Sequence, residues 1–399
     1  MPCFRVLLSA LACLLLLPGT PGAQTPEPAT VKIGHVRLAE PPSLQISLLE
    51  RPAEDEGAGG ARLAIDDNNT TGQFTNQKFE LVETFADTPE QAGEAVAGFA
   101  GQGIHFVVAD LPAEILLAFA DTAAAQDILV FNAGATDDAL RNEACRANLI
   151  HVAPSRAMLT DALAQYLVWK NWTRWFLIVG SHPADELYAA ALRRAAQRFG
   201  AEIVEERVFV DTGGARTTDS GTVQVQRQMP VFTQGAPDHH VVVVADESDV
   251  FGAHVPFRTW NPAPVAGTDG LRPTSWSPAH DLWGAIQLQN RFVADAHRLM
   301  TEKDMLSWTA VRIIGEAATR TASTDPATMA EFIKGADFEV AAFKGQKLTL
   351  RDWDLQLRQP ILLADGQTVV SVSPQEGFLH QHSELDTLGT DRPETRCRL

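Results

Sequence analysis

Polar and charged residues stand directly after several short apolar runs of this 399-residue sequence. Such continuous apolar runs are typical of strands that are buried on both faces of a parallel sheet. Ligands bind beyond the carboxyl ends of these strands, where loops and helix N-termini converge and where amide, hydroxyl and carboxylate groups can hold a small polar molecule. We therefore predict ligand contacts from ten residues. They are Asp110, Leu111, Asn132, Ala133, Gly134, Thr136, His182, Asp185, Asp246 and, as an aromatic wall, Trp276.

Several of these residues have an equally simple structural interpretation. Thr136 could cap the following helix, and Asn132 could close a turn. Asp185 could be an acid that the helix dipole favours, Asp246 could either hold an ammonium group or end its strand, and Trp276 could pack in a core. The sequence leaves these alternatives open.

Motifs for catalysis are missing from the sequence. It contains no G-x-S-x-G elbow, no P-loop and no H-E-x-x-H zinc motif. His239 and His240 are adjacent, so on a strand they would point to opposite faces and would not share a metal. His182, on a loop, could be an ordinary surface residue. We therefore expect no enzyme activity, no cofactor and no metal site.

Alternating strand and helix patterns must position the candidate residues. Apolar runs predict strands at 31–38, 79–85, 105–109, 128–131, 175–179, 202–210, 240–245, 348–350 and 367–373. Start signals and helical periodicity predict helices at 61–68, 89–100, from 112, and at 158–169, 185–199, 307–320 and 326–334. The spacing is that of right-handed βαβ units, and the pattern restarts after Pro154. The predicted fold class is α/β, with two doubly wound, Rossmann-like lobes in tandem.

The N-terminus has the composition of a secretory signal. Arg5 precedes an apolar run over 6–17, and small and breaking residues over 18–23 follow it, so we predict a signal peptide of residues 1–23. Cys13 offers a weaker lipoprotein alternative. The leader carries one Arg and no acid, so its removal takes the net charge from −18 to −19. So acidic a chain disfavours nucleic acid as a partner.

Cys145 and Cys397 are the two cysteines that remain after the leader. In an oxidising, exported setting they predict one disulfide, which would tie the C-terminus to the first half of the chain. The alternative is two separate thiols, one buried and one on a loose tail.

Several local runs resemble the branched-chain amino acid type of periplasmic binding protein. They are Val31-Lys32-Ile33-Gly34, the run 60–69 before Gly72, Asp87 to Ala92, Val130 to Thr136 and Gly267 to Leu271. The resemblance extends over roughly 31–375. It implies a type I periplasmic binding protein fold, in which two lobes are joined by a multi-strand hinge, and the solute-binding role of an ABC transporter in the periplasm, with a permease as partner.

A narrower resemblance lies in the C-terminal third. The runs 283–292, Phe343-Lys344-Gly345, Arg351 to Asp354, 356–360 and Leu385 to Gly389 resemble the subfamily associated with PQQ-dependent alcohol dehydrogenase systems. This implies a link to alcohol catabolism. A ligand-sensing or accessory protein of a periplasmic quinoprotein dehydrogenase, without a transport role, is the alternative.

Asp110 departs from the family pattern, because amino-acid-binding relatives present a Ser or Thr hydroxyl at this place. A carboxylate that faced the ligand would repel the carboxylate of an amino acid. We therefore expect an alcohol, an aldehyde or an amine as solute more than an amino acid.

The resemblance also implies how the chain divides between the lobes. We expect residues 31–152 and 284–350 in lobe 1, residues 153–283 and 351–375 in lobe 2, and a loop-like C-terminal tail over 376–399, with crossings near 152–154, 283 and 350.

Overall fold

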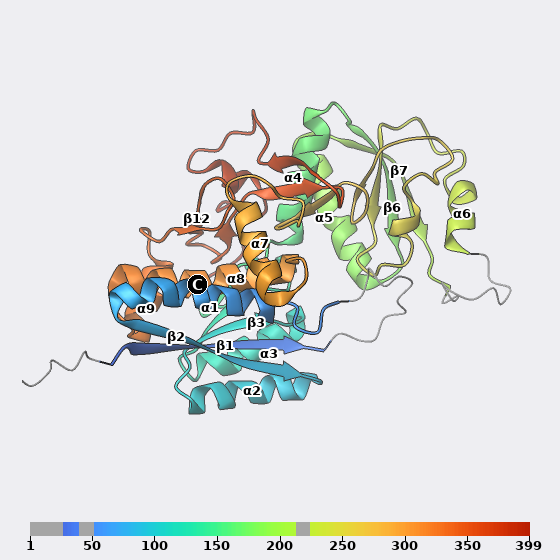
Figure 1. Cartoon of the computed structure of the whole chain (residues 1–399). Helices are drawn as coiled ribbons and strands as arrows, with labels where there is room; N and C mark the ends of the chain where they lie inside the picture. Colours follow the sequence, from blue (N-terminus) through green and yellow to red (C-terminus); the bar gives the residue numbers. More distant parts are fainter. Residues whose placement is uncertain (1–26, 40–51, 213–223) are drawn as a thin grey trace, which may run out of the picture.

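Two separate parallel β-sheets form the frame of the computed structural model, which describes residues 27–39, 52–212 and 224–399 (Figure 1). The first sheet has the order β2-β1-β3-β4-β5 and consists of β1 (Ala29–Leu38), β2 (Gln77–Ala86), β3 (Phe106–Asp110), β4 (Leu129–Asn132) and β5 (Leu149–His151). The second has the order β7-β6-β8-β9 and consists of β6 (Arg174–Gly180), β7 (Glu202–Phe209), β8 (Val241–Ala245) and β9 (Val265–Gly267). The predicted α/β class with two Rossmann-like lobes is confirmed. The predicted leader, residues 1–23, lies outside the described residues.

Strand β3 shows why its sequence is continuously apolar. All its residues are buried, and successive side chains enter different cores. Phe106 and Val108 pack with the helices of one face, and Val107 and Ala109 with those of the other. The first face is covered by α1 (Ala58–Thr75), α7 (Ala285–Ala296), α8 (Glu302–Thr321) and α9 (Pro326–Lys334), and the second by α2 (Pro89–Gly101) and α3 (Ala113–Ala124).

The second sheet is covered on both faces in the same way. Trp175 and Leu177 of β6 pack with helices α4 (Arg156–Trp169) and α5 (Pro183–Phe199). Phe176 and Ile178 face the other side, toward α6 (Val225–Phe232).

Two small antiparallel sheets complete the molecule. One has the order β10-β14-β15 and consists of β10 (Arg272–Thr274), β14 (Ile361–Ala364) and β15 (Val369–Ser373). The other has the order β11-β12-β13 and consists of β11 (Val340–Ala341), β12 (Lys347–Leu350) and β13 (Leu357–Arg358). Short 3-10 turns lie at η2 (Asp138–Arg141), η3 (Gly252–His254) and η4 (Glu384–Thr387). Within the described ranges, no helix is both long enough and apolar enough to cross a membrane.

Side-chain hydrogen bonds hold together three segments of the chain, which follow β5, β10 and β13 in the sequence. The Gln359 amide donates to the Val152 carbonyl at 2.7 Å, which joins the segment after β13 to the segment after β5. The Lys344 ammonium donates to the Ser275 carbonyl and to Gln359 Oε1, which joins the segment after β10 to the segment after β13. Leu357 of β13 packs in the core of the first sheet.

Helix α1 is longer than the sequence predicts. The expected end at 69–72 is passed, and the helix continues to Thr75. Asn69 is held there by two hydrogen bonds with the backbone of Phe79, and a side chain at Gly72 would collide with the Gln77 carbonyl. Tertiary partners therefore override the turn-forming tendency of the Asn and Gly residues.

The C-terminal tail over 376–399 consists of turns and loops that are packed against the rest of the molecule. Leu385 and Leu388 are buried, and the carboxylate of Asp386 accepts hydrogen bonds from Arg351 (2.9 Å) and Arg358 (2.8 Å). The tail is held in place because these two leucines are buried and because the charge of Asp386 is paired with two guanidinium groups.

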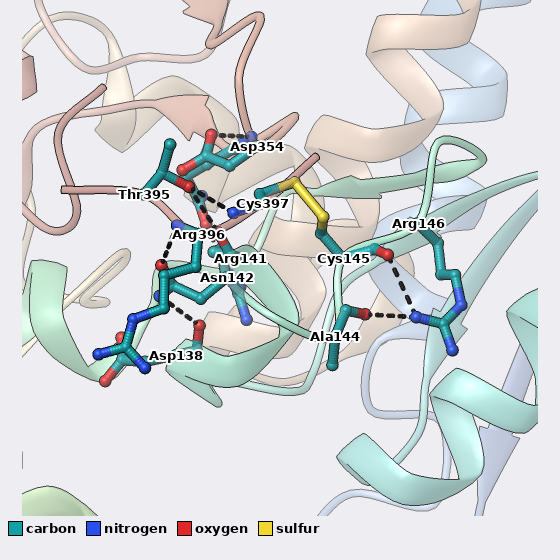
Figure 2. Close-up of a disulfide and its surroundings, with 11 residues drawn as sticks. Asp138, Arg141, Asn142, Ala144, Cys145, Arg146, Asp354, Thr395, Arg396 and Cys397 are labelled. Carbon is teal, nitrogen blue, oxygen red and sulfur yellow. Dashed lines mark hydrogen bonds between the residues drawn. A yellow bond between two sulfur atoms is a disulfide. The ribbon is translucent and has the colours of Figure 1, made fainter. Parts of the chain in front are cut away.

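The predicted disulfide is confirmed. Figure 2 shows the sulfur–sulfur bond between Cys145 and Cys397, whose Cα atoms lie 5.6 Å apart. Next to it, the Arg396 N–H donates to Asn142 Oδ1 at 3.2 Å.

Candidate functional site

Asp110 and Leu111 lie at the carboxyl end of β3, where they have different surroundings. Asp110 is buried and forms an ion pair with Lys303 of α8 at 3.3 Å. Its charge is therefore balanced within the protein, which weakens the expected repulsion of a ligand carboxylate. Leu111 belongs to the hydrophobic core below α2 and α3.

The loop after β4 is a closed turn built by Asn132. Its side-chain oxygen accepts from the N–H groups of Gly134 (3.1 Å) and Ala135 (2.9 Å), and its amide donates to the Ala135 carbonyl. A side chain at Gly134 would meet the Asp110 carboxylate, so the loops after β3 and β4 touch. Ala133 is buried in the core. Of the two interpretations of Asn132, the structure shows the turn.

Thr136 is partly buried, and its hydroxyl makes no hydrogen bond within the described part of the chain. Its carbonyl accepts from the N–H of Arg156 at 2.8 Å, which brings the start of α4 to this loop.

The loops after β6 and β8 are joined by the carboxylate of Asp185. This buried group accepts from the His182 N–H (3.1 Å) and from the N–H and hydroxyl of Ser248 (2.9 and 2.6 Å). The exposed His182 ring contacts Asp211 at 2.9 Å. Asp185 thus shapes the two loops.

Asp246 and Trp276 have structural surroundings as well. The Asp246 carboxylate accepts from the N–H groups of Val250, Phe251 and Gly252 at 2.6–3.0 Å and so closes the loop after β8. Trp276 is buried in the core of the first sheet, and its indole N–H has no partner among the described residues.

Arg156 links the two sheets and was missed by the sequence prediction. Its guanidinium contacts Asp137, which follows β4, at 3.0 Å, and Glu247, which follows β8, at 2.7 Å. Burial raises the pKa of Glu247, while Arg156 opposes this rise. One signal was available, because a basic residue in the first turn of a helix opposes the helix dipole and so calls for a local anion.

Lys303 was missed for a different reason. It lies near the start of α8, nearly 200 residues after its partner Asp110, and no local pattern connects the two. The loops after β3, β4, β6 and β8 thus form one network in which Asp110, Asp137 and Glu247 are each paired with a cation.

The network is suited to binding by charge and hydrogen bonds. Within the described ranges, no three His, Cys, Asp or Glu side chains gather in a way that could hold a metal ion. A hydrogen bond joins His35 Nε2 to Ser307 Oγ at 3.3 Å, but both residues are buried. Burial lowers the pKa of His35 to about 4, so the ring is neutral and structural.

The fold is similar to that of proteins described as periplasmic or solute-binding proteins. A family model described as "Periplasmic binding protein" matches residues 52–227. The structure of an ABC transporter substrate-binding protein from Sphaerobacter thermophilus has a TM-score of 0.68 at 18% identity and covers 86% of this chain and 98% of that chain. The fold is that of the type I periplasmic binding proteins.

Two further structures share this type I fold. A branched-chain amino acid ABC transporter periplasmic ligand-binding protein from Burkholderia xenovorans has a TM-score of 0.67 at 18% identity, covering 86% of this chain and 95% of that chain. A solute-binding protein from R. palustris in complex with benzoate has a TM-score of 0.64 at 12% identity, covering 93% and 100%. No curated protein sequence matches the chain.

Proposed function

We propose that this protein is the periplasmic solute-binding component of an ABC transporter and that it has no catalytic role. One observation carries the proposal. Arg156 joins the loop after β4 in the first sheet to the loop after β8 in the second, so ligand-facing loops of two Rossmann-like lobes meet at one place. The type I fold supports this role, because closure of two lobes around a solute is a hinge motion.

The proposed lobes are residues 31–152 with 284 to about 358, and 153–283 with about 359–375, the third boundary being moved by the packing of Leu355 and Leu357. The three hydrogen-bonded segments that follow β5, β10 and β13 provide the hinge between them.

The proposed ligand site lies between the loops after β3 and β4 of one lobe and those after β6 and β8 of the other. We place Thr136 and Asp110 against the solute, because the hydroxyl of Thr136 makes no hydrogen bond within the described part of the chain and the Asp110–Lys303 pair offers both charges. Such a site suits an alcohol-derived compound, an amine or an amino acid-like molecule. The runs near 283–292, 343–345, 351–354 and 385–389 support a link to PQQ-dependent alcohol catabolism.

A thermal-shift and calorimetric screen of short alcohols, their acids, amines, amino acids and the quinone tests this proposal. We expect one class to raise the melting temperature. Asp110→Asn and Thr136→Ala should each weaken the affinity for that ligand by about tenfold, since a hydrogen bond to a charged group is worth ~1.5–3 kcal/mol. Asp87→Asn and Thr122→Ala, at exposed positions on the first lobe, are the matched controls.

Two outcomes would contradict the proposal. Unchanged affinity in both Asp110→Asn and Thr136→Ala would place the ligand elsewhere. Retention of the protein by a quinoprotein dehydrogenase, with no shift from any small molecule, would favour the accessory role.

A further inference from the structure

A second hollow lies away from the loops that form the proposed solute site. Its volume is about 740 Å³, and it is bounded by α1, α7, α8 and the turn between β11 and β12. Trp283 and Arg291 come from α7 and the residues before it, Trp308 and Arg312 from α8, and Phe343 from the turn. We propose that this cavity is a separate binding site for a small, planar aromatic carboxylate.

The charge of the lining favours an anion. Four lining residues are basic (Arg291, Arg312, Lys344 and Lys347) and one, Asp67, is acidic, whereas the whole chain has a net charge of −18. Three of the basic groups are engaged elsewhere. The Lys344 ammonium is bonded to three oxygen acceptors, Arg291 is paired with Asp67, and Lys347 is paired with Glu339.

Arg312 is the cation left to receive a ligand. Its guanidinium donates to the neutral side chain of Asn68, and it forms no ion pair within the described part of the chain. Burial lowers its pKa, against the opposing effect of Asp67 and Glu316. Asp67 also accepts from the Trp308 indole (3.0 Å), and Glu316 lies 3.8 Å from Arg320. A partly buried guanidinium without an ion-pair partner binds a carboxylate favourably.

Aromatic side chains form the walls of the cavity. The ring centroids of Trp308 and Phe343 lie 5.5 Å apart, and the Trp283 side chain is 48% exposed. The Trp283 indole rests against the backbone of Gly345, where an added Cβ would lie 2.5 Å from the ring. The His280 ring packs against the same indole, with 5.5 Å between the two ring centroids. The indole is therefore held in place while part of its surface stays open, as a stacking surface for a flat ligand requires.

The two features together define the ligand class. A neutral aromatic compound would leave Arg312 without an anion, and a small carboxylate without a ring would leave the aromatic walls uncovered. The runs 283–292 and 343–345, which are distinctive in the sequence, meet at this cavity.

Isothermal titration calorimetry with benzoate and benzene-1,2-dicarboxylate tests the site, with benzyl alcohol and acetate as the probes that lack one feature. We expect the two aromatic acids to bind more tightly than either partial probe. Arg312→Gln should weaken their binding by at least about tenfold, because it removes a charge-assisted hydrogen bond. Trp283→Ala should weaken it too, and Arg312→Lys should restore part of it.

Arg320→Gln is the matched control, since Arg320 lies on the same helix outside the cavity lining and is half exposed. Melting curves establish that each variant is folded. The proposal is overturned if neither acid binds, if Arg312→Gln binds as the wild type does, or if Asp110→Asn and Thr136→Ala abolish binding while Arg312→Gln leaves it intact. That last result would assign the acids to the solute site and leave the proposed function standing.

Discussion

Carboxylates at the ends of the parallel strands are each held by a cation or by backbone N–H groups. Asp185 and Asp246 have backbone donors, whereas Asp110 and Glu247 have Lys303 and Arg156. The carboxylates of Asp185 and Asp246 stabilise the conformation of their loops. Asp110 and Glu247 are instead balanced by side-chain cations that come from other segments of the chain.

The burial of Lys344 predicts a pH dependence of stability. Burial lowers the pKa of its ammonium to about 7, well below the value of ~10.4 in an unfolded chain. Between these values the unfolded chain holds a proton that the folded protein has released, so stability rises with pH across this range, by at most ~1.4 kcal/mol per pH unit.

Urea unfolding of wild type and Lys344→Met at about pH 7.5 and about pH 9.5 measures this effect. The wild type should gain stability relative to the variant at the higher pH. The exposed Lys170→Met serves as control and should follow the wild type. Parallel pH profiles for wild type and Lys344→Met would contradict the prediction.

Helices α1 and α8 approach each other so closely that glycine is needed at the contact. A Cβ on Gly60 would lie 1.8 Å from the Asp304 carbonyl oxygen. The Asp304 carboxylate also accepts from the Gly57 N–H at 2.8 Å, so the starts of the two helices are bonded to each other.

Gly60→Ala should therefore destabilise the protein by ~1–3 kcal/mol, because the two backbones must move apart. Gly93→Ala in α2 is the matched control, since nothing lies within 4 Å of its Cβ position, and it should be neutral or stabilise by ~0.5–1 kcal/mol. Chemical denaturation measures both. Equal stability of the two variants would show that the helices can separate freely.

Among the secondary-structure elements, the prediction succeeded for strands that are buried on both faces and for a helix whose start and end signals are local in the sequence. The strands at 105–109 and 240–245 and the helix at 326–334 lie within one or two residues of β3, β8 and α9. The predicted end of α1 was wrong, because Asn69 and Gly72 do not form a turn but contact the following strand β2.

The tail joins both halves of the molecule. The disulfide attaches Cys397 to Cys145 beside the first sheet, while the Gly389 N–H donates to Asp161 of α4 at 2.8 Å and the Arg194 guanidinium of α5 donates to the Gly389 carbonyl at 2.9 Å. The tail therefore contacts both the segment before β5 of the first sheet and the helices α4 and α5 beside the second.

Replacing both cysteines by serine should lower stability. The bond closes a loop with a sequence separation of 252, for which chain-entropy models give an upper estimate of ~5 kcal/mol. Thermal melts of the wild type with and without a reductant measure the effect. The double variant should melt like the reduced wild type and should not respond to the reductant. If the oxidised wild type and the double variant had the same melting temperature, the disulfide would not stabilise the protein and the prediction would be wrong.

The sequence alone determined the fold class, many of the strands and helices of the two large sheets, and the cysteine pair, because each depends on local periodicity or on a small number of partners. It did not predict the short strands β5, β9 and β14 or the helices α6 and α7. The candidate loops were also predicted, since the carboxyl end of a parallel strand is visible in the chain. Only the tertiary structure decided which polar side chains serve the loops and which cations balance the buried carboxylates. Arg156, Lys303 and Arg312 depend on partners that are distant in the chain or on a cavity between helices, and no local pattern encodes such charge compensation.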